Sequence, residues 1–147
     1  NLVYYGRGPF ENYIDRYSGA FIGRYEDKVE NQFYWYIRPQ ETGNKTDVRW
    51  LSLLDSEGQG VRITGLQPIA FSALHFSPED LDPGLTRKLQ HTIDIVPQKN
   101  IFLHVDLKQR GLGGDNSWGM YPHNEYRLLD KKYTYSYMIE LVKKNSD

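Results

Sequence analysis

The feature that most constrains the fold of this 147-residue chain is a series of short β-prone runs separated by turn residues. Aromatic and β-branched residues dominate the runs, and glycine, proline, aspartate and asparagine fill many of the gaps. The runs comprise residues 2–5, 32–38, 48–54, 61–64, 69–76, 89–96, 101–107, 125–129 and 133–142. Because the connections are short, consecutive runs are expected to pair as antiparallel strands. The sequence therefore predicts an all-β fold, an antiparallel β-sandwich.

Helical signals are confined to two places. Residues 77–80 (Ser-Pro-Glu-Asp) supply an N-cap hydroxyl, a proline for the first turn and carboxylates where the helix dipole favours them. Residues 12–22 carry a second, weaker helical pattern. No repeat, linker or low-complexity segment divides the chain, so we expect one domain over residues 1–147, with residues 143–147 forming a frayed polar tail.

The composition excludes several classes of function. Lys and Arg number 18 against 19 Asp and Glu, and the net charge of −1 provides no basic field for nucleic acid. The absence of cysteine excludes disulfides, zinc–thiolate sites and cysteine nucleophiles. No apolar run approaches the roughly 20 residues that a membrane helix needs. The chain starts at Asn1 without a signal-peptide pattern, which favours an excised or processed piece of a longer protein and leaves both cytoplasm and periplasm open.

A glycine-rich loop, GLGGDNSWG at residues 111–119, places four glycines around one tryptophan. A phosphate-binding loop would need a lysine or a helix start, and neither follows these glycines. Two interpretations remain. Either the glycines form a bulge or wide turn and Trp118 fills a core, or the loop presents the Trp118 ring as a platform for a ligand. In the second case the ring is supported by Gly113, Gly114, Asp115, Asn116 and Ser117.

Two further polar loops are unusual for a β domain. The first, GRGPFENYIDR at residues 6–16, surrounds a Gly-Pro corner, and the second, RPQETGNKTDVRW, spans residues 38–50. Carboxylates alternate with guanidinium groups in both, a pattern typical of paired charges that hold loops in place. We therefore predict partly buried, hydrogen-bonded pairs: Glu41 with Arg49, or Asp15 and Arg16 with nearby partners. These four residues are the predicted structural anchors.

Catalytic and metal sites are not evident. A glycosidase needs two carboxyl groups about 5 to 9.5 Å apart, for which Glu11 and Glu41 are the candidates. Arginines stand close to both in sequence and would lower their pKa values, which suits an anchor better than a general acid. The histidines are scattered at His75, His91, His104 and His123. No HExxH, CxxC, GxSxG or acidic calcium motif is present, so a metal site is not expected.

The three loops together carry a recognisable pattern. Its residues are Gly6-Arg7-Gly8-Pro9, Glu11-Asn12-Tyr13 and Asp15-Arg16, then Pro39-Gln40-Glu41, Gly43-Asn44, Asp47 and Arg49-Trp50, then Gly111, Gly113-Gly114-Asp115 and Ser117-Trp118. In this order and spacing they resemble the C-terminal domain of β-galactosidases of glycoside hydrolase family 2. A single GxGGD would be weak evidence, whereas three matching loops are specific. The resemblance extends from about residue 5 to residue 142, nearly the whole chain.

The resemblance implies an antiparallel sandwich of the galactose-mutarotase-like supersandwich type, of which this chain is the C-terminal half. It implies that two catalytic glutamates, with ligands for Mg and Na beside them, lie in a TIM barrel outside this chain, and that the chain itself holds no cofactor. Trp118 matches the family's tryptophan that reaches into the barrel and packs against the substrate. The implied role is accessory, in the hydrolysis of terminal β-D-galactosides, with no activity of the chain alone.

The implied partners are a galactoside at Trp118, the barrel and first half of the sandwich, and further copies in a homo-oligomer. A half-sandwich is expected to expose edge strands and apolar surface. Two alternatives remain open. A stand-alone carbohydrate-binding module would use Trp118 and surface tyrosines as platforms. A mutarotase-like epimerase would need histidines and a carboxylate on one concave face, which the positions of His75, His104 and Glu41 relative to Trp118 test.

Overall fold

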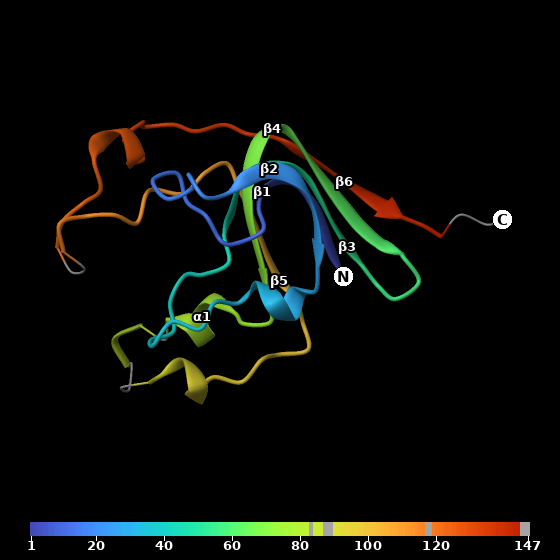
Figure 1. Ribbon diagram of the computed structural model, residues 1–147, viewed down its shortest axis with the longest axis horizontal. Coiled ribbons are helices and arrows are strands. Elements are labelled where there is room, and N and C mark those ends of the chain that lie inside the picture. Colours follow the sequence, from blue (N-terminus) through green and yellow to red (C-terminus); the bar gives the residue numbers. More distant parts are fainter. Residues whose placement is uncertain (83, 87–89, 117–118, 145–147) are drawn as a thin grey trace.

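The computed structural model describes residues 1–82, 84–86, 90–116 and 119–144, which form a curved antiparallel sheet with long loops to one side of it (Figure 1). The strands are β1 (Leu2–Gly8), β2 (Phe21–Asp27), β3 (Lys45–Leu54), β4 (Gly60–Leu74), β5 (Phe102–Asp106) and β6 (Tyr137–Val142). Short helical turns lie between them: η1 (Val29–Gln32), α1 (Pro78–Leu81), η2 (Gly84–Thr86), η3 (Thr92–Asp94) and η4 (Asn124–Tyr126). The predicted all-β class is confirmed.

The sheet has the strand order β2-β1-β3-β4-β5, and every pair is antiparallel. The long strand β4 has two partners on one side, because β6 pairs with residues 60–65 and β5 with residues 70–74. The register between β3 and β4 shifts twice near the start of β3, between Lys45 and Trp50. Such irregularities bend a strand. This bend lies where the polar loop at residues 38–50 joins the sheet.

A tight turn joins β3 to β4. The Oδ1 atom of Asp55 accepts hydrogen bonds from the backbone N–H groups of Glu57 and Gln59 at 2.8 and 2.9 Å. Gly58 has a φ of 79°, a left-handed conformation that glycine adopts without steric cost. The turn expected from the sequence DSEGQG is therefore present.

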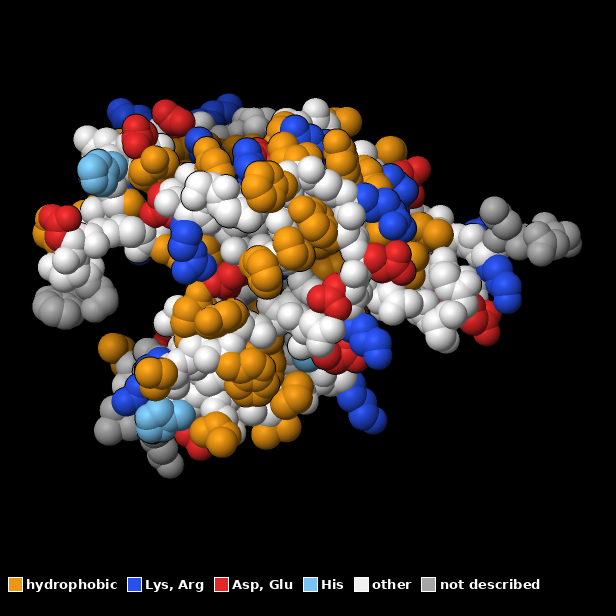
Figure 2. Space-filling model, in the orientation of Figure 1, with side chains coloured by type: hydrophobic (Ala, Val, Ile, Leu, Met, Phe, Trp, Pro, Cys, Tyr) orange, Lys and Arg blue, Asp and Glu red, His pale blue; other side chains and the backbone are white. Residues whose placement is uncertain are grey.

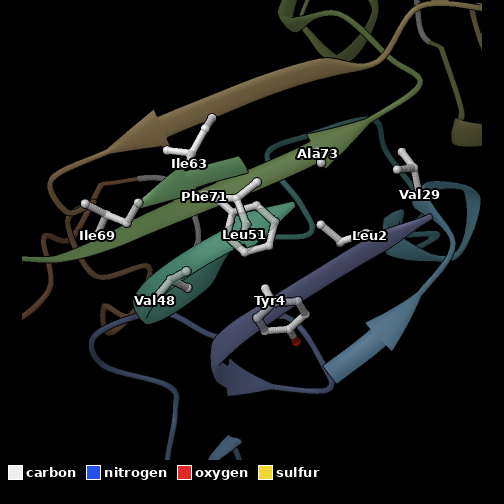
Figure 3. Packing of buried hydrophobic residues seen from close by; sticks show 9 residues of the cluster. All are labelled: Leu2, Tyr4, Val29, Val48, Leu51, Ile63, Ile69, Phe71 and Ala73. Atoms are coloured by element: carbon white, nitrogen blue, oxygen red, sulfur yellow. The ribbon is translucent and has the colours of Figure 1, made fainter. Parts of the chain in front are cut away.

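One face of the sheet carries the main hydrophobic core (Figure 3). Leu2 and Tyr4 on β1, Leu51 on β3 and Phe71 on β4 are each at most 1% exposed. Alternate residues of a strand point to one face, so the three central strands bring these side chains together. The Tyr4 and Phe71 rings meet edge to face, with centroids 5.3 Å apart. β1, β3 and β4 thus form the firm centre on whose ends the polar loops are built.

A second apolar cluster packs beyond the end of β4, and its members are Phe33, Leu74, Phe76, Leu81 and Ile95. The helix α1 supplies Leu81 to it. Ser77 and Asp80 form a reciprocal capping box, in which each side chain accepts a hydrogen bond from the other's backbone N–H. The short helix predicted at residues 77–80 is confirmed.

Three predicted strands are wrong. Residues 33–38 are irregular, η3 occupies part of the run at 89–96, and η4 occupies part of the run at 125–129. The first run is aromatic because its rings pack against one another and against the second cluster. The ring centroids of Tyr34 and Tyr36 lie 4.6 Å apart, and those of Phe33 and Phe76 lie 4.4 Å apart. Its composition therefore reflects ring packing rather than strand pairing.

The weak helix predicted at residues 12–22 is also wrong. Tyr13 and Arg16 exchange backbone hydrogen bonds of 3.2 and 2.8 Å and so close a tight turn, after which β2 begins at Phe21. The sequence analysis missed β2, because most side chains of this edge strand are exposed and lack the alternation of a half-buried strand. The runs at 61–64 and 69–76 merge into one strand, β4.

Apolar side chains remain exposed at both margins of the sheet. On β6, Ile139 and Leu141 are 62% and 74% exposed, although Ile139 pairs with the buried Ile63. Phe21, at the start of β2, is also exposed. Figure 2 shows hydrophobic side chains gathered over the middle of one face. Surfaces of this kind are suited to contacts with other protein.

Two further findings concern the ends and the surroundings of the chain. Of the predicted frayed tail at residues 143–147, residues 145–147 lie outside the described residues. No helix within the described ranges is both long enough and apolar enough to cross a lipid bilayer.

Candidate functional site

The three polar loops singled out in the sequence meet at one end of the sheet, and we call this meeting point the loop junction. It comprises residues 6–16, 38–50 and the described part of 111–119. The glycine-rich loop belongs to an arm that leaves the end of β5 and extends away from the sheet (Figure 1). Direct hydrogen bonds join the first loop to each of the other two.

Asn12 joins the first loop to the second. Its backbone N–H donates to the carbonyl of Asn44 at 2.8 Å, and the Asn44 amide donates back to the Asn12 carbonyl at 2.8 Å. The Asn12 Oδ1 atom accepts from the backbone N–H and the hydroxyl of Thr46 at 3.0 and 2.5 Å. Both asparagines are buried. A buried polar network with most of its hydrogen bonds made holds its loops in a single arrangement.

Glu11 is the most heavily hydrogen-bonded acidic group of the junction. Its Oε1 atom accepts from the Arg16 guanidinium at 2.5 Å and from the Tyr36 hydroxyl. Its Oε2 atom accepts from the Thr42 hydroxyl at 3.1 Å and from the Gly43 backbone N–H at 2.9 Å. Burial acts to raise the pKa of Glu11, but these four hydrogen bonds outweigh it and hold the pKa below its usual value. The carboxylate therefore stays ionised.

An ion pair ties β1 to the second loop. The Nε atom of Arg7 lies 2.5 Å from Oδ2 of Asp47, and Arg7 also donates to the Ala20 carbonyl at 2.9 Å. Asp47 has a φ of 53°, which is uncommon for a residue other than glycine. Arg49, a predicted anchor, donates to the Asp47 carbonyl. Arg49 thus fixes the main chain of its own loop, and the structure does not pair it with Glu41.

Asp15 ties the glycine-rich loop to the first loop. Its Oδ2 atom accepts a hydrogen bond of 2.6 Å from the backbone N–H of Gly113. The N–H of Gly111 donates to the Tyr126 carbonyl at 2.7 Å, so the start of the loop is held at two points. A Cβ atom at Gly111 would lie 2.5 Å from Oδ2 of Asp15 and 2.8 Å from Cβ of Tyr126. Glycine is needed here for close approach.

The supporting residues of the platform hypothesis are only partly described. Trp118 and Ser117 lie outside the described residues, so the roles assigned to them stay predictions. The Asn116 Oδ1 atom accepts from the backbone N–H groups of Gly119 and Met120 at 2.8 and 3.3 Å. Gly113, Gly114 and Asp115 line a pocket of about 340 Å³ together with Asp15. Among the described residues, no group of three or more His, Asp or Glu is placed to hold a metal ion.

Glu41 lies apart from the arginines, in a pocket of about 240 Å³ that it shares with His104. Glu41 as a whole residue is exposed, but the walls of this pocket are mostly apolar. Desolvation raises the pKa of Glu41, against a hydrogen bond from Gln109 and the charge of His104. His75 is not part of this group, because its Nδ1 atom lies 2.9 Å from the Gln98 carbonyl oxygen. The structure thus brings together one histidine and one carboxyl of the set that an epimerase would need.

Comparison with known proteins identifies the family. The family model described as "Beta galactosidase small chain" matches residues 1–139. The chain belongs to the β-galactosidase small-chain family. A β-galactosidase of Priestia megaterium (strain DSM 319 / IMG 1521) is 38% identical over 141 residues, and one of Streptococcus thermophilus is 37% identical over 142 residues. Each alignment covers 95% of this chain but only 13% of the relative's own length.

The sequence analysis missed several residues that hold the junction of this small-chain domain together. They are Asn12, Tyr36, Thr42 and Asn44. Their signal was the cluster of short polar residues between turn glycines, since Asn and Thr side chains often satisfy nearby backbone groups. Predictions based on charged pairs gave these neutral side chains no role.

The close approach of Asp15 and Tyr126 to Gly111 leads to a stability prediction. Gly111→Ala is expected to lower the free energy of unfolding by about 1 to 3 kcal/mol, because the new methyl group overlaps the Asp15 carboxylate and the Tyr126 Cβ atom. Urea denaturation of the purified variants measures this. Gly19→Ala is the matched control, since nothing lies within 4 Å of a Cβ at that position. Equal stability of the two variants would show that the glycine-rich loop is not held closely at its base.

Proposed function

We propose that this small-chain domain is a C-terminal accessory part of a larger β-galactosidase of glycoside hydrolase family 2, acting in carbohydrate metabolism on terminal β-D-galactosides. The relatives that carry the name β-galactosidase extend far beyond the aligned region, which is 13% of their length. The two catalytic glutamates and the Mg and Na ligands are proposed to lie in a TIM barrel in that remaining part. The exposed margins of the sheet are proposed to contact the barrel, the first half of the sandwich and other subunits.

Within this proposal, Trp118 completes the galactoside pocket. The observation that carries the idea is the hydrogen bond of 2.6 Å between Asp15 and the Gly113 N–H, which fixes the base of the glycine-rich loop. The firm centre of the sheet supports Asp15 in turn, through the first loop. A platform held in advance loses less freedom when a ligand binds, so more of the contact energy contributes to affinity.

Trp118→Ala in the complete polypeptide tests this role. One face of an indole ring covers about 60 Å² of apolar sugar surface, worth about 1.5 kcal/mol at about 25 cal/mol per Å². We therefore expect KM for a chromogenic β-galactoside to rise about tenfold, with the melting temperature nearly unchanged. Steady-state kinetics and a thermal melt on the same preparation measure both.

Trp35→Ala provides the control, because Trp35 is a largely exposed tryptophan that lies outside the glycine-rich loop. It should leave KM unchanged. Truncation of a buried tryptophan would instead lower the stability of Trp118→Ala by about 3 to 5 kcal/mol and leave KM intact. That result would refute the platform and establish the core-plug interpretation instead.

A further inference from the structure

A pocket of about 420 Å³ opens between the first polar loop and the segment that follows β2. Its walls come from residues 9–16, from residues 27–36 and from Lys45. No residue of the glycine-rich loop is among the described residues that line it. We call it the Lys45 pocket and consider it separately from the site proposed for Trp118.

The two carboxylates in the wall of this pocket are already engaged by the protein. Glu11 accepts the four hydrogen bonds given above. The Oδ1 atom of Asp27 accepts from the Lys28 N–H at 2.8 Å and from the Asn31 amide at 2.7 Å, and its Oδ2 atom accepts from the Gln32 amide at 3.0 Å. Both amides thus turn their nitrogen, and not their oxygen, towards Asp27.

Lys45 is the unusual group of the pocket. It is only 2% exposed, and its Nζ atom donates to the Gly43 carbonyl at 3.1 Å. Within the described part of the chain it makes no ion pair and has no second acceptor. Burial lowers the pKa of Lys45 to about 8, against the charges of Glu11 and Asp27. An ammonium group buried with unmade hydrogen bonds is unfavourable, so the pocket favours an occupant that supplies acceptor oxygens.

The remaining wall is aromatic. Tyr34 is 58% exposed and packs at 4.6 Å on Tyr36, and the exposed Phe10 stands at the rim. The four charged side chains of the wall, Glu11, Arg16, Asp27 and Lys45, sum to zero, so the pocket offers no net attraction for an anion. Flat apolar rings beside donors and acceptors without net charge suit a neutral polyhydroxylated ligand.

We propose that the Lys45 pocket is a second carbohydrate-binding site. A neutral sugar lies with one apolar face against the Tyr34 ring, a hydroxyl oxygen accepts a hydrogen bond from the Lys45 ammonium, and other hydroxyls donate to the amide oxygens of Asn31 and Gln32. This site is independent of Trp118 and of the catalytic groups, so it stands or falls separately from the proposed function.

The test uses the complete polypeptide and methyl 1-thio-β-D-galactoside, a galactoside that resists hydrolysis. A structure determined with this probe should show one sugar against Tyr34, with an oxygen at hydrogen-bonding distance from Lys45 Nζ. Equilibrium binding in solution should show a second class of site. Tyr34→Ala should weaken that class about tenfold, while kcat and KM for a chromogenic galactoside stay unchanged.

Two comparisons sharpen the test. Lys45→Met keeps an unbranched side chain, one heavy atom shorter, but removes its donors, and it should weaken the second class as Tyr34→Ala does. Phe21→Ala removes an exposed ring outside the pocket and should have no effect. The proposal fails if other parts of the polypeptide fill the pocket, if it holds only water, or if sugar binds there at crystal concentration only. It also fails if Tyr34→Ala leaves the second class intact.

Discussion

Purified on its own, the 147-residue chain is expected to leave a chromogenic β-galactoside unhydrolysed. Glycoside hydrolysis requires one carboxyl group as acid and a second as nucleophile or base. Glu11, one of the two candidates, is bound by Arg16, Tyr36, Thr42 and the Gly43 N–H, which leaves its oxygens no freedom to attack a sugar. A continuous assay compares the isolated chain with the complete polypeptide, which serves as the positive control. Hydrolysis should be detected only with the complete polypeptide.

Glu41 alone does not remedy this. Its raised pKa is the property of a general acid, and His104 lines the same pocket. The second carboxylate of that pocket, Asp82, already accepts a hydrogen bond of 3.1 Å from the Gly84 N–H. Turnover by the isolated chain that disappears on Glu11→Gln or Glu41→Gln would contradict this prediction and would place the catalytic pair inside the small-chain domain.

The second large effect is expected at Glu11. Glu11→Ala removes the acceptor of the Tyr36 and Thr42 hydroxyls and of the Gly43 N–H, and leaves Arg16 without its counter-ion. Arg16 is about half exposed and can be hydrated, so the cost comes mainly from the buried donors. We expect a loss of about 3 kcal/mol in the free energy of unfolding, which for this size is a fall of about 6 to 12 °C in Tm.

The pH dependence of this contribution has a definite sign. The pKa of Glu11 is lower in the folded chain than its ordinary value of 4.5, so the stabilisation is present above that pH and is lost as the pH falls further. Urea denaturation at neutral pH and at low pH should therefore show the Glu11→Ala difference shrinking in acid. Glu41→Gln is the matched control, since Glu41 has no cationic partner among the described ion pairs, and it should cost less than about 1 kcal/mol. A larger loss at Glu41 than at Glu11 would reverse the assignment of anchors.

The fold was predictable where β-prone residues form mostly buried runs. β1, β3 and β4 are largely buried or half-buried along their length, so their composition carries the signal directly. β2 was missed because it is an edge strand with little buried surface. The aromatic run at residues 32–38 was misassigned because ring-on-ring packing uses the same residue types as a strand. The pattern of a single sequence shows which residues are bulky and apolar enough to be buried. It does not show which neighbouring element buries them.

The site was predictable as a set of loops but not as a set of contacts. The alternation of carboxylates and guanidinium groups correctly pointed to ion pairs, such as Arg7 with Asp47 and Arg16 with Glu11. The actual partners depend on how β1 and β3 place the loops, which sequence spacing does not reveal. The contact of Asp15 with the Gly113 N–H joins residues 98 positions apart, and a backbone donor has no sequence signature.

The two partners of β4 differ in what holds them. β5 covers the end of β4 that carries the buried residues 69–74, whereas β6 lies along its other end with nearly all of its own side chains in solvent. The attachment of β6 therefore relies mainly on its backbone ladder, which any extended peptide can replace.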